Sequence, residues 1–263
     1  MYTFEYQNPV SAAAAASAAR GDARYLAGGQ SMVQALKLRL ARPGTLVDLN
    51  GIAELSGITS VGGNVVIGAM TRHSEVARSA DVKKAIPALA DLAGGIGDQM
   101  VRNQGTLGGS IANADPAACY PAALLALGAT IRTPQRTLSA DNFFTGLFET
   151  ALAPGELVTS VEFPVPDKAG YFKFKQPASR FALVGVFVAK FGSTVRVAVT
   201  GAKSHVFRAT DIEAALAKSF TPEAAAAVKV SAEGINGDLH GSAEYRAAMV
   251  PVMAGRAVAK ALG

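Results

Sequence analysis

The sequence contains little of what several classes of protein require. It has no tryptophan, one cysteine (Cys119) and three histidines among 263 residues. A single cysteine excludes an internal disulfide framework, and it excludes an iron–sulfur or zinc centre ligated by the cysteines of this chain alone. The histidines, His73, His205 and His240, are far apart in the sequence. We therefore expect no metal site in this chain.

Charged residues are also scarce, at 17% of the chain, against roughly 25% in typical soluble domains. A low charge content indicates that partners cover part of the surface. The net charge is +5, but the lysines and arginines are dispersed, and no basic run alternates with aromatic residues. Nucleic acid binding is therefore not expected, whereas a bound anionic ligand would fit the positive balance.

Long apolar segments are absent as well. The longest apolar run, residues 122–131, has about half of the roughly 20 residues that a membrane-spanning helix needs. The N-terminal residues lack the basic start and apolar block of an export signal. We expect no transmembrane segment and a cytoplasmic location.

The chain is long enough for one large or two modest domains, and its mixture of short β-like runs and helical patterns predicts an α+β fold. Strands are predicted at 24–27, 45–48, 58–61, 65–69, 124–131, 157–163, 181–191 and 195–200. Helices are predicted after Ser11, over 32–40, 74–78 and 82–93, and beginning near Asp211, Pro222 and Ser242. The segment 164–170 is the clearest linker, and it places a domain boundary after residue 166.

Two glycine-rich segments carry the chemistry. The first, residues 26–32, places Gly28 and Gly29 between a predicted strand and a predicted helix. Glycines allow the backbone to turn with positive φ and to approach a ligand closely, and the N–H groups that open a helix attract anions. A phosphate site is one interpretation; a plain tight turn is the other.

The second segment, residues 102–115, is interpreted as a loop in which Gly108 and Gly109 lie among small hydroxyl and amide side chains. Two separate loops of this composition can converge on one pyrophosphate through their N–H groups. Neither segment has the spacing of a Rossmann fingerprint or of a P-loop. A dinucleotide would therefore be bound by another fold.

Three segments, 26–31, 101–116 and 174–180, resemble the FAD-binding medium subunit of molybdenum hydroxylases, the family of aerobic carbon monoxide dehydrogenase and xanthine dehydrogenase. The resemblance covers nearly the whole chain. It implies a FAD-binding domain of the vanillyl-alcohol-oxidase (PCMH) type at 1–166, with two subdomains that meet near 52–58. It also implies an α+β domain at 167–263 of the carbon monoxide dehydrogenase flavoprotein type.

The resemblance also implies roles for individual residues. Five residues of the second segment would complete the phosphate and ribityl shell: Thr106, Gly108, Gly109, Ser110 and Asn113. Ile96 and Val158 would pack near the cofactor. Lys175 would lie beside the isoalloxazine. The residues that would wrap the pyrophosphate and the nearby ribityl chain are Tyr25, Leu26, Ala27, Gly28, Gly29, Gln30, Ser31 and Met32.

Two positions need separate comment. Cys119 stands where related proteins commonly have an aspartate that binds the sugar-like chain of the flavin. Since a thiol is a weak donor and a poor acceptor, that contact should be weakened, and we interpret Cys119 as a small buried residue. His73 could be read as a covalent flavin attachment point, but a histidine at the start of a helix is the simpler interpretation.

The resemblance implies a FAD-carrying electron-transfer subunit. Its partners would be a large molybdenum–pterin subunit and a small subunit with two [2Fe–2S] clusters, assembled as a dimer of heterotrimers. Electrons would pass from the clusters through FAD to an external acceptor. Two alternatives are a self-contained flavin oxidase of the same fold and a non-redox nucleotide-binding assembly module.

Overall fold

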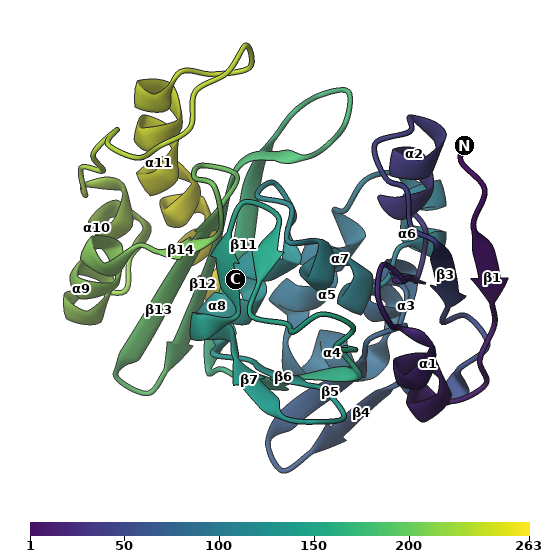
Figure 1. The fold of residues 1–263 in the computed structure, drawn as a ribbon. Helices are drawn as coiled ribbons and strands as arrows, with labels where there is room; N and C mark the ends of the chain where they lie inside the picture. The colour runs from purple at the N-terminus through teal and green to yellow at the C-terminus, as the bar shows by residue number, and fades with distance from the viewer.

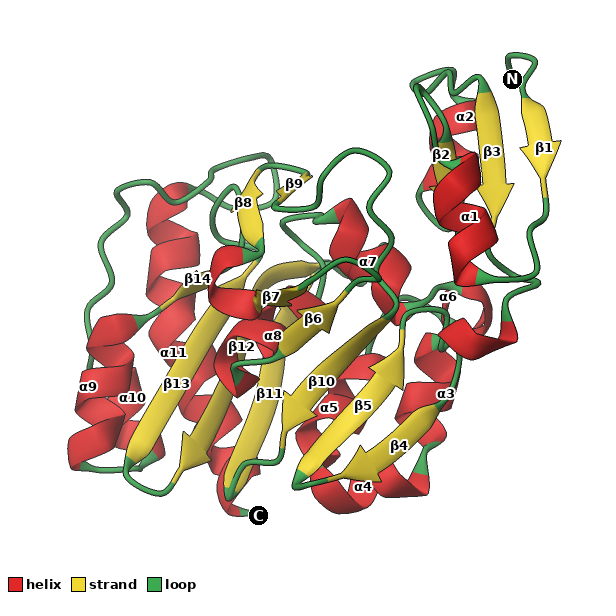
Figure 2. Cartoon of the chain, turned by 60° about the horizontal axis from the view of Figure 1, so that its bottom comes forward, coloured by secondary structure: helices red, strands yellow, loops and turns green.

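The N-terminal part of the chain forms a small lobe. A computed structural model describes residues 1–263, and in it this lobe has a parallel three-stranded sheet of order β1-β3-β2. Figure 2 shows the lobe beside the rest of the molecule. The Ser11 hydroxyl accepts the Ala14 N–H and thereby starts the first helix. The elements are β1 (Glu5–Gln7), α1 (Ala12–Ala18), β2 (Arg24–Leu26), α2 (Met32–Lys37), β3 (Thr45–Asp48) and the 3-10 helix η1 (Ala53–Leu55).

The middle of the chain forms an antiparallel five-stranded sheet of order β4-β5-β10-β6-β7, with six helices inserted between β5 and β6. The strands are β4 (Ile58–Val61), β5 (Asn64–Gly68), β6 (Thr130–Arg132), β7 (Thr137–Ser139) and β10 (Ser160–Pro164). The helices are α3 (His73–Arg78), α4 (Ala80–Ala85), α5 (Pro87–Gly94), α6 (Gln99–Gln104), α7 (Leu107–Asn113) and α8 (Tyr120–Leu127). The 3-10 helix η2 (Ala140–Asn142) and a short hairpin of β8 (Phe144–Gly146) and β9 (Glu149–Thr150) follow β7.

The C-terminal part is an antiparallel sheet of order β11-β12-β13-β14 with helices α9, α10 and α11 on its outer side (Figure 1). Along β12 the side chains alternate between two cores. Val184, Val186 and Val188 pack toward α11, whereas Phe187 packs toward α8. The elements are β11 (Lys168–Lys175), β12 (Ala182–Phe191), β13 (Thr194–Thr200), β14 (Phe207–Arg208), α9 (Thr210–Lys218), α10 (Pro222–Ala226) and α11 (Ala243–Leu262).

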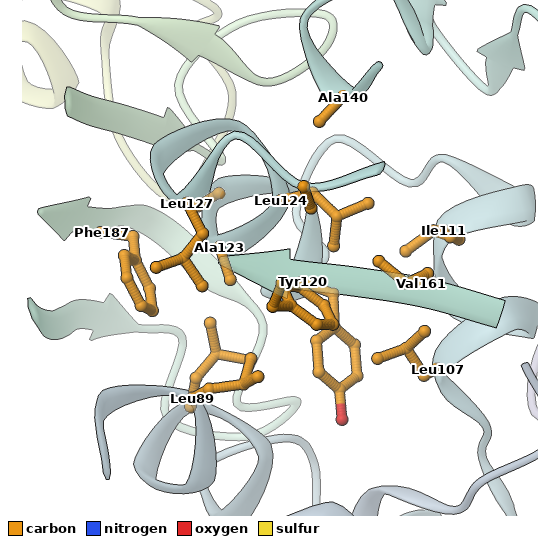
Figure 3. Packing of buried hydrophobic residues seen from close by; sticks show 14 of the residues in the cluster. Leu89, Leu107, Ile111, Tyr120, Ala123, Leu124, Leu127, Ala140, Val161 and Phe187 are labelled. Atoms are coloured by element: carbon orange, nitrogen blue, oxygen red, sulfur yellow. The ribbon is translucent and has the colours of Figure 1, made fainter. Parts of the chain in front are cut away.

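Helix α8 lies at the centre of the molecule, where every one of its residues is buried. Figure 3 shows Leu124 and Leu127 of this helix packed between Phe187 of β12 and Val161 of β10. A strand was expected over 124–131, which is wrong for most of that range: residues 124–127 belong to α8, and only residues 130 and 131 belong to the strand β6. A short, uniformly apolar run has no periodicity that separates a buried helix from a buried strand. Gly128, with φ +63°, ends the helix before the strand β6.

Two further expectations need correction. The segment interpreted as a loop over 102–115 is mostly helical, because Thr106 caps a new helix in which Gly108 and Gly109 lie in the first turn. The linker is shorter than expected, since β11 already begins at Lys168. The strand β1 was not predicted. The α+β class, the strands expected at 58–61 and 65–69, which pair as a hairpin of β4 and β5, and the three C-terminal helices are confirmed. No helix combines the length and apolar character needed to cross a membrane.

Candidate functional site

A large cavity of about 780 Å³ receives residues from all three parts of the chain. Lining residues come from the turn after β2, from the start of α7, from the N-cap of α8 and from the loop that follows β11. Fifteen of the seventeen residues predicted at a cofactor site line it: Tyr25, Ala27, Gly28, Gly29, Gln30, Ser31, Met32, Ile96, Thr106, Gly108, Gly109, Ser110, Asn113, Cys119 and Val158. Leu26 and Lys175 do not.

The first glycine segment is a turn from β2 into α2. Gly29 has φ +71°, a conformation that favours glycine. A Cβ atom on Gly28 would lie 2.0 Å from the carbonyl oxygen of Gln104, so only glycine fits there. The N–H groups of residues 28–31 have no acceptor within the chain. Four consecutive unpaired N–H groups on the wall of a cavity make a concave site for an anion.

The second glycine segment packs directly against the first. A Cβ atom on Gly108 would lie 2.5 Å from Ala69 Cβ, and one on Gly109 would lie 3.4 Å from Ala27 Cβ. The two segments are therefore adjacent, as the convergence hypothesis requires. Their contributions differ, however. The N–H groups of residues 107–110 all donate within the chain, to Thr71, Ala69 and Thr106. The free N–H groups on the cavity wall therefore belong to the first segment. The second segment contributes side-chain groups and a backbone that packs closely against the first.

A lysine reaches the cavity from β11, but it is Lys173 and not Lys175. The Lys173 ammonium donates to the carbonyl oxygens of Gly95 and Arg180, each at 2.8 Å, and lies 3.4 Å from the Cys119 sulfur. Lys175 is exposed and lies outside the lining. The physical reason is a register shift between Phe174 and Lys175, which breaks the alternation of side chains at the end of the strand.

Comparison with known proteins identifies the family. The model of the FAD binding domain in molybdopterin dehydrogenase matches residues 2–166. The chain belongs to this family. It is 38% identical to the carbon monoxide dehydrogenase medium chain of Hydrogenophaga pseudoflava, over 97% of this chain and 96% of that one. It is 35% identical to the nicotine 6-hydroxylase medium subunit of Paenarthrobacter nicotinovorans, over 91% and 90%. The solved structure of quinoline 2-oxidoreductase from Pseudomonas putida 86 matches with a TM-score of 0.90 and 32% identity, over 99% and 97%.

Several residues of this medium subunit line the cavity although the sequence analysis did not assign them to it. Arg180 and Phe148 have positive φ, +61° and +56°, and strain of this kind is common where a chain is shaped around a ligand. The Arg180 guanidinium donates to the Gly97 carbonyl at 3.2 Å, and Phe181 is half exposed beside it. Arg180 belongs to the segment 174–180, which resembles the family, and this resemblance was the one sign in the sequence that Arg180 lies near the cofactor.

Burial shapes the titration of the cavity wall. It lowers the pKa of His73 to about 4, with the nearby Arg102 charge as a second cause, so this imidazole is neutral at pH 7. Burial raises the pKa of Tyr25 to about 12, and the Tyr25 hydroxyl donates to the Gly155 carbonyl at 2.8 Å. It also raises the pKa of Asp115. The Arg136 guanidinium lowers the pKa of Glu156 to about 2. No two of these titratable groups are arranged as a general acid and a general base, so the cavity wall is suited to binding a ligand rather than to proton transfer.

Proposed function

We propose that this subunit holds FAD in the cavity and passes electrons from iron–sulfur clusters of a partner to an external acceptor. As a member of a family of dehydrogenase and hydroxylase subunits, the chain is an oxidoreductase subunit with an FAD-binding domain. Electron transfer through it is the proposal. The single observation that carries the assignment of the site is the row of four unpaired N–H groups at residues 28–31, all of which line the large cavity.

The residues present fit the pyrophosphate of FAD. A diphosphate needs several N–H donors and a wall without Cβ atoms, and Gly28 and Gly29 supply both. A Cβ atom on Gly109 of the second segment would lie 3.4 Å from Ala27 Cβ, so the absence of a side chain at Gly109 keeps space open beside the first segment. Ser110 and Asn113, both on the same face of α7, would bind the ribityl chain or the phosphates.

Other residues of the cavity wall fit a flat ring system. Ile96 and Val158 contribute apolar surface to the wall, as the resemblance implied, and Lys173 holds a positive charge there. Bound FAD would supply the redox chemistry, which no side chain of this protein provides. The role of Lys173 would be electrostatic, because a fixed cation favours an anionic ring. This role was predicted for Lys175, and the geometry transfers the proposal to Lys173.

The assembly and the location remain part of the proposal. We expect a large molybdenum–pterin subunit, a small subunit with two [2Fe–2S] clusters, and a dimer of these heterotrimers in the cytoplasm. Support comes from the names of the relatives, which are medium chains of carbon monoxide dehydrogenase and of a nicotine hydroxylase.

A flavin titration of the purified chain tests the proposal. We expect saturable quenching of FAD fluorescence with a stoichiometry of one, together with a yellow protein after gel filtration. A chain that stays colourless and leaves the fluorescence unchanged would refute FAD binding and favour the assembly module. Turnover of small alcohols or aldehydes by the isolated, FAD-loaded chain would instead favour the self-contained oxidase.

A further inference from the structure

A second pocket lies between α3 and α6, outside the cavity described above. Its volume is about 390 Å³. Its six lining residues are all polar: Arg72, Ser74, Glu75, Arg78, Asn103 and Gln104. None of them lines the cofactor cavity. Because no apolar side chain lines this pocket, it is not a packing defect of the hydrophobic core, and a ligand that binds there would be polar.

The pocket holds two positive charges without partners. The guanidinium groups of Arg72 and Arg78 take part in none of the ion pairs of the chain. The one negative group is Glu75, and one of its carboxylate oxygens accepts the backbone N–H of Arg72 at 2.7 Å. With two arginines and one glutamate, the net charge of the pocket is positive, and both guanidinium groups can donate their N–H groups to a ligand.

Ser74 adds a hydroxyl group to the pocket. The residue as a whole is only 5% exposed, yet it lines the pocket, and its hydroxyl is not among the buried side-chain atoms that lack a partner. It is therefore accessible from the pocket and available to a ligand there. Asn103 and Gln104, which also line the pocket, have side-chain amides that can donate as well.

We propose that this pocket binds a phosphate group, either free or carried by a small metabolite. The donor set is that of a phosphate site: two guanidinium groups, each able to bind two oxygens, one hydroxyl and two amides. The site is adjacent to the cofactor cavity, because Gln104 lines the pocket while its carbonyl oxygen lies 2.0 Å from the place that a Cβ atom on Gly28 would occupy. The two sites are nevertheless distinct, since Ser74 and Arg78 belong only to the pocket.

The test is a titration of the full-length, FAD-saturated protein with inorganic phosphate, followed through the arginine Nε–H signals in NMR spectra. We expect saturation with a Kd of about 1 mM or tighter. Arg78→Gln should weaken binding about tenfold, since it removes a charge-assisted contact. Glu75→Gln should strengthen binding several-fold, because glutamine keeps the acceptor for the Arg72 N–H and removes the negative charge.

The control is Arg20→Gln, which removes another exposed arginine, just after α1, and should leave the affinity unchanged. Arg72→Gln provides a second test should Arg78→Gln fail to fold by thermal melting. Non-saturating shifts, or equal losses in Arg20→Gln and Arg78→Gln, would overturn the proposal. Stronger competition by succinate than by methyl phosphate would overturn the assignment to phosphate. Because Arg78 is outside the cavity, a failure here is separate from a failure of FAD binding.

Discussion

Gly28 carries no side chain because the carbonyl oxygen of Gln104 occupies the place where its Cβ would be. The sequence indicates that two glycines before a helix allow another part of the chain to approach the backbone closely. It does not indicate which part of the chain does so. The same holds for Lys173 and Lys175. Both lie on one strand two residues apart, and only the register shift beside Lys175 decides which of them reaches the cavity. An irregularity of that kind has no signature in residue type.

Gly109→Val should abolish FAD retention and leave the fold largely intact. A Cβ at this position already lies 2.8 Å from the Thr106 hydroxyl oxygen and 3.4 Å from Ala27, so a branched side chain would fill the slot between the two glycine segments. The flavin absorbance of the purified variant measures retention. Gly94→Ala is the control, because a Cβ there meets only ordinary contact. Full FAD occupancy in Gly109→Val would remove this segment from the site.

Lys173→Met and Lys175→Met form a matched pair. Loss of the Lys173 cation should lower the flavin reduction potential by about 30 mV, equivalent to about 1.4 kcal/mol for a two-electron couple, because an anionic reduced ring loses a stabilising charge. Lys175→Met should leave the potential unchanged, since Lys175 is exposed outside the cavity. Redox titration of both variants decides the matter. The opposite pattern would return the role to Lys175.

At the scale of elements, α8 connects the cavity to the C-terminal sheet. Its N-cap, Cys119, lies on the cavity wall, and its last turn is held by Arg196 of β13. Most helices and strands were predictable because turn residues, caps and prolines mark their ends, as Thr221 and Pro222 do for α10. Helix α8 was not, because uniform burial removes the polar face that gives a helix its pattern.

Arg196→Met should destabilise the protein by about 1–3 kcal/mol. The Arg196 guanidinium donates twice to the Leu125 carbonyl, at 2.9 and 2.7 Å, and pairs with Asp141. Methionine would leave that carbonyl at the end of α8 with the Gly128 N–H, at 3.2 Å, as its remaining donor. Urea unfolding of the variant measures the loss, and Arg20→Met serves as the exposed control. An unchanged free energy of unfolding, or a large loss of FAD affinity in the folded variant, would contradict this purely structural role.

At the scale of the whole molecule, the cavity exists only where the three parts of the chain meet. Tyr25 comes from the N-terminal lobe, Thr106 from the middle part and Arg180 from the C-terminal part. Composition and local pattern gave each segment separately. Their meeting depends on tertiary packing. The composition of the two glycine segments suggested that these two converge, and only the family resemblance indicated that the segment 174–180 joins them. Buried titratable groups at this junction should also make stability depend on pH.

The free energy of unfolding should fall by about 2 kcal/mol between pH 7 and pH 5 because of His73. Its pKa is about 4 in the folded protein and near 6.5 when free, so below pH 6.5 the unfolded chain binds a proton that the native chain excludes. Urea unfolding at both pH values measures the change. In His73→Gln this component should vanish, and an equal loss in the variant would assign it to other groups.

Glu156 does not interfere with that measurement. Its pKa is lowered to about 2 from an ordinary value of 4.5 by Arg136. Its contribution to stability is therefore complete above pH 4.5 and is lost as the pH falls toward 2. The two pH windows overlap only between about pH 4 and pH 4.5, so a curve of unfolding free energy against pH resolves the two contributions.

The Lys173 ammonium has three protons, and the structure provides three neighbours for them: Gly95, Arg180 and Cys119. No proton is left over for a guest in the cavity. The lysine would therefore influence a bound flavin through the electric field of its fixed charge and not through a hydrogen bond. For that reason Lys173 should change the reduction potentials of flavin analogues that differ only in their acceptor atoms by the same amount. It should change the reduction potentials of analogues that differ in charge by different amounts.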